Sequence, residues 1–247
     1  MGNDNKTKKN AKSGKLNKNK YKVVLLKTFK WLSIIISIII LFTFYQVISL
    51  NFVNPKKTNL MKIRINESSE NKKKIKIYHL WKPMNKISPH LVKSVIAAED
   101  AHFYEHFGFD IKGIKNAVTK NKKSKKVKFG GSTITQQLAK NLFLWPGRSY
   151  LRKVLEAYYT ILLEIFLSKN RILEIYLNII EWGNGLFGAE VASLKYFKIS
   201  ADKLSPMQAA TLAVIIPNPR KYKLYSNYIL KRKRVIRKYS NDVKLEK

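Results

Sequence analysis

Residues 31–50 contain no charged side chain, and this uncharged run constrains the fold more than any other feature of the chain. An α-helix needs about 20 apolar residues to cross a bilayer, and the run WLSIIISIIILFTFYQVISL has that length. The core helix of a soluble protein is rarely uncharged for so long. A cleaved signal peptide would have a shorter apolar region followed by small residues, whereas residues 51–55 are bulky. We therefore expect one uncleaved transmembrane anchor over residues 31–53.

The sequence on either side of the anchor predicts its orientation. Residues 1–30 are rich in lysine and poor in large apolar side chains, which predicts a disordered basic tail. Lysines next to a span keep that end in the cytoplasm, and a long following domain crosses largely regardless of its charge. We expect a single-pass protein of the cell membrane with residues 1–30 in the cytoplasm, a stalk over residues 54–74 and an extracytoplasmic domain over residues 75–247.

The formal net charge of +34 favours an anionic partner. An extracytoplasmic domain on a membrane anchor is poorly placed for nucleic acid, so anionic membrane lipid is the expected partner and no nucleic acid is expected. The chain contains no cysteine, which removes disulfides and thiol chemistry from consideration.

The stretch from Ser88 to Asp110 carries the first candidate for chemistry. Ser88 and Pro89 are typical of a helix start, and apolar residues then recur at helical spacing. Glu99 falls on the same apolar stripe, where burial would raise its pKa toward the range that a general base needs. The alternative is a carboxylate at the rim of the stripe or in a salt bridge with a lysine.

The rest of the domain predicts helices with little strand. Thr133 with Gln136 and Ser205 with Gln208 match capping boxes, and further helices are expected over residues 151–167, from Ser168 to about Trp182, and over residues 227–239. A short strand is expected over residues 74–78. The expected fold class is mainly α.

Three short motifs match known signatures without the context that those signatures require. Gly183-x-Gly185-x-x-Gly188 fits a dinucleotide fingerprint, but a helix rather than a strand precedes it. The pattern from His102 to His106 matches H-x-x-E-H, but a zinc site needs a third ligand. Ser200-x-x-Lys203 has no K-T-G partner. We expect neither a nucleotide site nor a zinc site at the first two motifs, and we interpret the third as an accidental match.

Three longer stretches fit together. They are Glu99-Asp100-x-x-Phe103-x-x-His106-x-Gly108, then GGSTITQQ (130–137) with Lys140, Asn141 and Arg148, and finally Arg152-Lys153-x-x-Glu156 followed by SKNRILEIYLN (168–178). In order and spacing, residues 75–220 closely resemble the family 51 glycosyltransferases, the peptidoglycan glycosyltransferases. The membrane helix ahead of the domain is similar to that of the monofunctional transglycosylases.

This resemblance implies a lysozyme-like, mainly helical domain that polymerises lipid II into glycan strands and releases undecaprenyl pyrophosphate. Glu99 matches the family's general base and Glu156 its second carboxylate. The other matching residues bind or surround the substrate: Asp100, Phe103, His106, Ser132, Gln136, Gln137, Lys140, Asn141, Arg148 and Lys153. Of these, Lys140, Arg148 and Lys153 match the cations that hold the diphosphate. The partners implied are lipid II, the growing glycan strand and other cell-wall synthesis proteins.

Two other functions compete with this one. A lysozyme-like muramidase or lytic transglycosylase would share the fold and one glutamate, but it needs no diphosphate-binding cations. A basic membrane-anchored scaffold would have no reason to combine two carboxylates with cations between them. No cofactor is required by the sequence and no metal ligand set is expected, although Mg or Mn could assist at the diphosphate.

Overall fold

The protein is described here by a computed structural model that covers residues 4–70, 75–124, 131–147, 149–222, 224 and 226–246. The chain divides into two units, Met1–Ile48 and Ser49–Lys247, and each is considered by itself.

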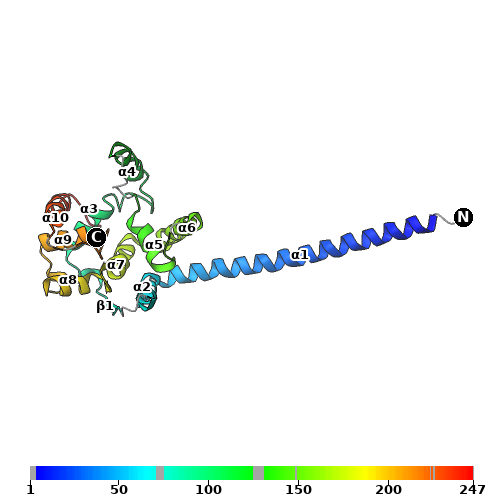
Figure 1. Cartoon of the computed structure of the whole chain (residues 1–247), viewed down its shortest axis with the longest axis horizontal. Coiled ribbons are helices and arrows are strands. Elements are labelled where there is room, and N and C mark those ends of the chain that lie inside the picture. The colour runs from blue at the N-terminus through cyan, green and yellow to red at the C-terminus, as the bar shows by residue number, and fades with distance from the viewer. Residues whose placement is uncertain are drawn as a thin grey trace. The chain divides into compact units, whose positions relative to one another are not determined.

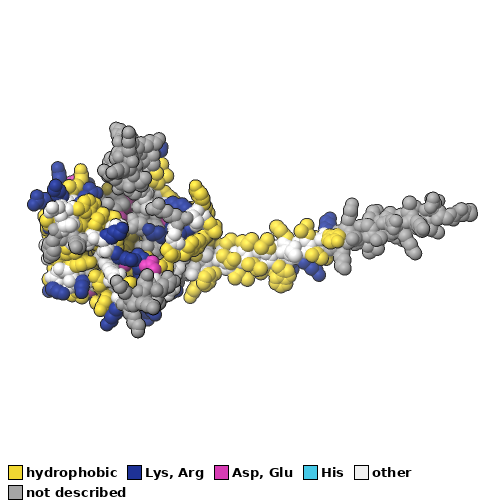
Figure 2. Space-filling model, viewed as in Figure 1, with side chains coloured by type: hydrophobic (Ala, Val, Ile, Leu, Met, Phe, Trp, Pro, Cys, Tyr) yellow, Lys and Arg dark blue, Asp and Glu magenta, His cyan; other side chains and the backbone are white. Residues whose placement is uncertain are grey.

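The first unit is formed by helix α1 (Asp4–Ser49), and its part from Tyr21 onward is the one described helix long and apolar enough to cross a membrane. Hydrophobic side chains cover this part in Figure 2, with lysines at its N-terminal end. The prediction of disorder was wrong for residues 4–30, because the backbone is helical from Asp4. Lysine and leucine are good helix formers, and extending an existing helix is easier than nucleating one.

The second unit is mainly α-helical (Figure 1). Its helices are α2 (Asn59–Glu70), α3 (Pro89–Glu99), α4 (Ile111–Ser124), α5 (Ile134–Phe143), α6 (Tyr150–Phe166), α7 (Lys169–Ile179), α8 (Ala189–Phe197), α9 (Pro206–Ile215) and α10 (Asn227–Tyr239). Two 3₁₀ turns, Met84–Lys86 and Ala201–Lys203, and three short strands, β1 (Tyr78–His79), β2 (Glu181–Gly183) and β3 (Leu186–Phe187), complete the described elements.

The helix starts are set by local capping. The Ser88 hydroxyl accepts from the backbone N–H of His90, and Thr133 and Ser205 form the expected capping boxes with Gln136 and Gln208. These caps satisfy backbone N–H groups that have no partner inside the helix. The predicted helix starts are thereby confirmed.

Two groups of helices build the domain. Helices α3, α9 and α10 pack together, and α5 packs against both α6 and α7 (Figure 1). Residues 209–215 of α9 and residues 175–179 of α7 are buried, so these two helices form the centre of the core. Both α3, which ends at the predicted base Glu99, and α5, which carries Gln136, Gln137, Lys140 and Asn141, rest on this core.

A small mixed sheet with strand order β1-β3-β2 corrects two sequence predictions. The helix from Ser168 was expected to continue to about Trp182, but α7 ends at Ile179 because residues 181–183 pair with β3. The strand expected over residues 74–78 is confined to Tyr78–His79, which pairs in parallel with β3; Lys74 lies outside the described residues. Both differences arise from long-range pairing that local periodicity does not contain.

Gly185 and Gly188 of the dinucleotide-like motif allow the tight backbone turns at this sheet. Gly188 ends the β2–β3 hairpin and caps α8 with φ at +86°, and a Cβ atom there would lie 2.6 Å from the backbone oxygen of Asn178. Gly185 has φ at +72°, and a Cβ atom added there would lie 2.5 Å from the backbone oxygen of Lys76. Only glycine combines a positive φ with such close backbone contacts.

We expect Gly188→Ala to lower the free energy of unfolding by more than about 2 kcal/mol, because strain at φ and a backbone clash act together. Thermal unfolding of the full chain followed by circular dichroism would measure this. Gly147→Ala is the matched control, since Gly147 has φ at +103° but open space around the added Cβ. Equal losses for the two variants would show that the clash with Asn178 is unimportant.

The residues expected to form a stalk belong to the second unit. Met61 of α2 is buried, and the Arg64 guanidinium lies 2.8 Å from the carboxylate of Glu181, which is itself buried. Arg64 also pairs with Glu67 on the same helix. These contacts hold α2 against the domain as part of its fold.

Candidate active site

Glu99 is the last residue of α3, and its side chain is half-buried. Burial raises the pKa of its carboxyl, and the neighbouring Asp100 carboxylate raises it further. A hydrogen bond from Gln137 and the charges of Lys140 and Arg232 act in the opposite direction without cancelling the rise. The sequence prediction of a carboxyl on a buried stripe with a raised pKa is therefore matched by this geometry.

A chain of two hydrogen bonds orients the Glu99 carboxylate. The Tyr176 hydroxyl, on a fully buried side chain of α7, donates to the Gln137 carbonyl oxygen at 2.9 Å. The Gln137 amide nitrogen then donates to Glu99 Oε2 at 2.8 Å. Since Tyr176 occupies the carbonyl side of the amide, the NH₂ group is directed at the carboxylate. Tyr176 thus acts through Gln137, a role that the sequence reasoning did not assign to it.

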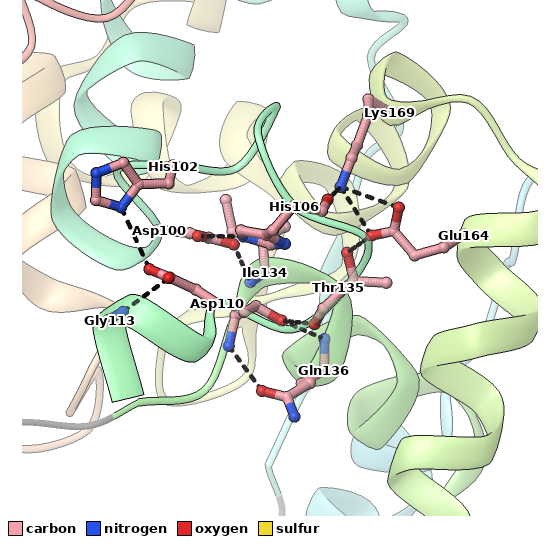
Figure 3. Close-up of polar contacts among 12 residues, drawn as sticks. Asp100, His102, His106, Asp110, Gly113, Ile134, Thr135, Gln136, Glu164 and Lys169 are labelled. Atoms are coloured by element: carbon pink, nitrogen blue, oxygen red, sulfur yellow. Dashed lines mark hydrogen bonds and ion pairs between the residues drawn. The ribbon is translucent and has the colours of Figure 1, made fainter. Parts of the chain in front are cut away.

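Asp100 fixes the loop that follows Glu99. Its buried carboxylate accepts from His106 Nε2 at 2.8 Å and from the backbone N–H of Ile134 at 3.0 Å. The second bond satisfies the start of α5, where a negative charge is also favoured by the helix dipole. Figure 3 shows the contacts of the Asp100 carboxylate with both His106 and Ile134. Asp100 and His106 therefore hold the loop that follows Glu99 against the start of α5.

A second set of contacts pins the same loop and was not predicted. The Lys169 ammonium donates to the backbone oxygen of His106 at 2.6 Å, pairs with Glu164 at 2.9 Å and lies 4.6 Å from the centre of the Phe103 ring. The Thr135 hydroxyl donates to Glu164 at 2.6 Å (Figure 3). Phe103 is fully buried, so the loop is held by α5, α6 and α7 together.

The second predicted carboxylate, Glu156, is buried on α6 and held by two cations. Its oxygens lie 3.1 Å from Arg152 Nη1 and 2.5 Å from Lys153 Nζ. Nε of Arg152 is buried without a hydrogen-bond partner among the described residues, and Lys153 is exposed. The carboxylate therefore fixes the positions of two cations, one partly buried and one exposed.

Lys140 on α5 is electrostatically linked to both carboxylates. Surrounding protein atoms lower the pKa of its ammonium although the residue is exposed, and the charges of Glu156 and Glu99 oppose this effect. The charges of Arg152 and Lys153 lower that pKa as well. The structure thus gathers Lys140, Arg152 and Lys153 into one cationic group beside Glu156.

Two cavities open at these residues. One of about 300 Å³ is lined by Glu99, Asp100, His102, Asp110 and Ser132 together with small and backbone groups. The other, of about 310 Å³, combines Lys140, Asn141, Arg152 and Arg64 with the apolar side chains of Leu60, Ile63, Leu144, Trp145 and Pro146. One cavity is therefore polar and carries the candidate base, whereas the other is cationic and partly apolar.

The remaining predicted residues fall into three groups. Ser132 is exposed at the polar cavity and Asn141 is half-buried at the cationic one. Gln136 is buried, and its carbonyl oxygen accepts from the Thr133 backbone in the capping box, so one end of its amide serves the helix. Arg148 lies outside the described residues.

The two histidines of the H-x-x-E-H motif contact different carboxylates. His102 Nδ1 lies 3.3 Å from Asp110, which also caps α4 by accepting from the Gly113 backbone, whereas His106 contacts Asp100 (Figure 3). No group of three His, Asp or Glu side chains that could hold a metal ion occurs within the described ranges.

The sequence was compared with those of known proteins. The family model described as Transglycosylase matches residues 67–242, which is more than half of the chain. The chain belongs to this transglycosylase family. It is 52% identical over 169 residues to the biosynthetic peptidoglycan transglycosylase of Azoarcus sp. (strain BH72), covering 68% of this chain and 73% of the relative. It is 48% identical over 200 residues to the protein of that name from Caulobacter vibrioides, covering 80% and 84% respectively.

Family membership confirms several expectations. The chain is a peptidoglycan glycosyltransferase, and its second unit is the mainly α, lysozyme-like domain that the sequence predicted. The apolar helix α1 is compatible with a single-pass membrane anchor.

The Tyr176–Gln137–Glu99 chain leads to a prediction for this transglycosylase. Tyr176→Phe removes the donor that orients the Gln137 amide, and a lost hydrogen bond to a buried group is worth about 1–1.5 kcal/mol. We expect kcat to fall roughly tenfold with KM nearly unchanged, as measured by steady-state glycan synthesis. Tyr196→Phe, which removes a hydroxyl that bonds the Trp182 backbone oxygen, is the control and should keep the parent rate. An unchanged kcat for Tyr176→Phe would exclude the orienting role.

The raised pKa of Glu99 predicts how stability depends on pH. A carboxyl whose pKa is higher in the folded chain binds more protons when folded, so its stabilisation is complete below the ordinary value of 4.5 and is lost as the pH rises through the folded value. Glu99→Gln, which keeps an acceptor for Gln137, should therefore raise the Tm at neutral pH, and this gain should shrink toward pH 4. Thermal unfolding of both proteins across this pH range would measure it. A gain independent of pH would contradict the burial argument.

Proposed function

We propose that this transglycosylase polymerises lipid II, a disaccharide-peptide on undecaprenyl pyrophosphate, into glycan strands by inverting glycosyl transfer. In the proposed reaction, Glu99 removes the proton from the 4-hydroxyl of the acceptor sugar. The acceptor oxygen forms a bond to the anomeric carbon of the donor strand as the bond from that carbon to the pyrophosphate oxygen breaks. Undecaprenyl pyrophosphate leaves with the bonding electron pair, and the proton remains on Glu99.

The observation that carries this proposal is the separation of charge between the two cavities. Glu99 lines the polar cavity, which suits a sugar acceptor, while the cations gather at the second cavity with Lys140 linked to both carboxylates. Fixed cations stabilise the negative charge that develops on a leaving diphosphate without any proton transfer. The apolar side chains around the cationic cavity suit the first isoprene units of the lipid.

The two carboxylates then have different tasks. Glu99 has one hydrogen bond from an amide and a raised pKa, which suits proton transfer near neutral pH. Glu156 is held by Arg152 and Lys153, so its task in the proposal is to position these cations at the diphosphate. The inverting outcome follows from attack on the face opposite the leaving group. The proposal places residues 1–30 in the cytoplasm and the catalytic domain outside.

The test uses the full chain in detergent with purified lipid II and, in parallel, with intact peptidoglycan. The proposal expects glycan strands that a muramidase degrades, which shows β-1,4 linkage, together with release of undecaprenyl pyrophosphate. Cleavage of intact peptidoglycan without polymerisation would favour a lytic enzyme and refute the proposal. Binding of either substrate without turnover would favour a scaffold and refute it equally.

A further inference from the structure

A cavity of about 570 Å³ lies away from both catalytic carboxylates, and the proposed reaction does not use it. Its lining is mostly apolar and comes from three stretches of the second unit: the segment that follows α1, helix α2 and the chain around β1. The residues that line it are Asn54, Pro55, Lys56, Lys57, Met61, Lys62, Ile65, Ile77, His79 and Trp81. None of them is a predicted site residue, so the cavity needs a separate explanation.

The polar part of this lining is cationic. Lys56, Lys57 and Lys62 are exposed, and within the described part of the chain no ion pair links them to an acidic side chain. Three ammonium groups beside an apolar hollow are complementary to a ligand with an anionic head and a hydrocarbon body. A free phosphate ion would use the lysines but would leave the apolar walls without a partner.

His79 also lines this cavity, but its ring is already surrounded by the chain. Burial lowers the pKa of its imidazole, and hydrogen bonds to the backbones of Asn178 and Lys56 act in the opposite direction. The contacts proposed for an anionic head group therefore rest on the three lysines.

One wall of the cavity is held in place by Arg171 of α7. Its guanidinium donates to the backbone oxygen of Leu50 at 2.8 Å and to the side-chain oxygen of Asn54 at 2.7 Å, and it lies 5.5 Å from the centre of the Trp81 ring. Glu174 pairs with the same guanidinium at 2.8 Å. The segment after α1 and Trp81 are thus fixed to one side chain, which keeps the cavity formed without a ligand.

We propose that this cavity binds one anionic phospholipid, with its phosphate at Lys56, Lys57 and Lys62 and the start of an acyl chain against Met61, Ile65 and Trp81. Asn54 and Pro55 follow the end of α1 by only five and six residues, so the stretch of chain between that helix and the cavity is short. The lipid would connect the domain to the outer leaflet at a site distinct from the substrate cavities. This proposal needs the membrane anchor but is independent of the reaction proposed above.

The test uses the full chain in nanodiscs that contain a small fraction of brominated lipid, because bromine quenches tryptophan fluorescence at short range. The chain has four tryptophans, and the difference between the parent and Trp81→Phe isolates the signal of Trp81. Brominated phosphatidylglycerol is compared with brominated phosphatidylcholine at the same fraction. No lipid II is present, so the result does not depend on catalysis.

We expect Trp81 to be quenched preferentially by the anionic lipid, and Lys56→Gln, Lys57→Gln and Lys62→Gln together to reduce the apparent affinity at least about tenfold. The control replaces three exposed lysines elsewhere, Lys86, Lys195 and Lys203, by Gln, and should keep the preference. Equal quenching by both lipids would mean that Trp81 simply faces the membrane and would overturn the proposal. Equal losses in the two triple variants would also overturn it, because they would indicate attraction by net charge alone.

Discussion

Glu99→Gln is expected to lower the rate of glycan synthesis by about 10²- to 10⁴-fold, the contribution that a positioned general base makes. The amide has nearly the shape of the carboxylate and can still accept the hydrogen bond from Gln137, so substrate binding should change little and KM should stay near the parent value. Steady-state kinetics with lipid II at several concentrations would measure both constants.

The matched control for this variant is Glu105→Gln. Glu105 lies in the loop that follows Glu99 but is exposed and makes no ion pair among the described residues. The Glu105→Gln variant should therefore synthesise glycan at the parent rate. A Glu99→Gln protein that retains more than about a tenth of the parent kcat would mean that another group removes the proton.

Asp100→Ala is expected to destabilise the domain by about 3 kcal/mol. The substitution leaves the backbone N–H of Ile134 and the ring of His106 without their shared buried acceptor, and each buried group that loses its partner is costly. For a domain of this size, the Tm should fall by about 6–12 °C. Thermal unfolding of the full chain, followed by circular dichroism, would measure the change.

Asp242→Ala is the control for this effect, because Asp242 is exposed beyond the end of α10. Its Tm should match that of the parent. An Asp100→Ala protein that unfolds at the parent temperature would show that the loop after Glu99 is held by the Lys169 contacts alone.

Local sequence signals were sufficient to predict where helices begin. The serines and threonine at positions 88, 133 and 205 cap their helices as expected, because capping depends on residues only two or three positions apart. The end of α7 was missed because it is decided by the pairing of Glu181 with Phe187, and the long helix at the N-terminus was missed because it extends from the apolar segment.

Periodicity also did not predict which apolar faces would be covered. Leu151 and Val154 belong to the apolar stripe of α6 yet remain largely exposed, whereas Glu156 on the same helix is buried. The hydrophobic pattern shows that a helix has two faces but not what lies against each of them.

Only part of the candidate site could be predicted from the sequence, because several of its contacts join residues that are far apart in the chain. Glu99 was identified from its place on an apolar stripe, and the resemblance to a family supplied Glu156 and the cations. The contacts of Tyr176 with Gln137 and of Lys169 with Glu164 and His106 join different helices and the loop after Glu99, and no spacing rule connects such positions. The residues that orient the candidate base Glu99, or the loop after it, through such contacts were therefore identified only from the structure.

The most direct test of the central claim is the pH dependence of kcat/KM for glycan synthesis by the parent and by Glu99→Gln. If Glu99 is the base, the parent rate falls on the acid side with an apparent pKa above the ordinary glutamate value of 4.5, because burial raises it, and the residual rate of the variant shows no such fall. The same acid-side fall in both proteins would assign that titration to another group and contradict the role proposed for Glu99.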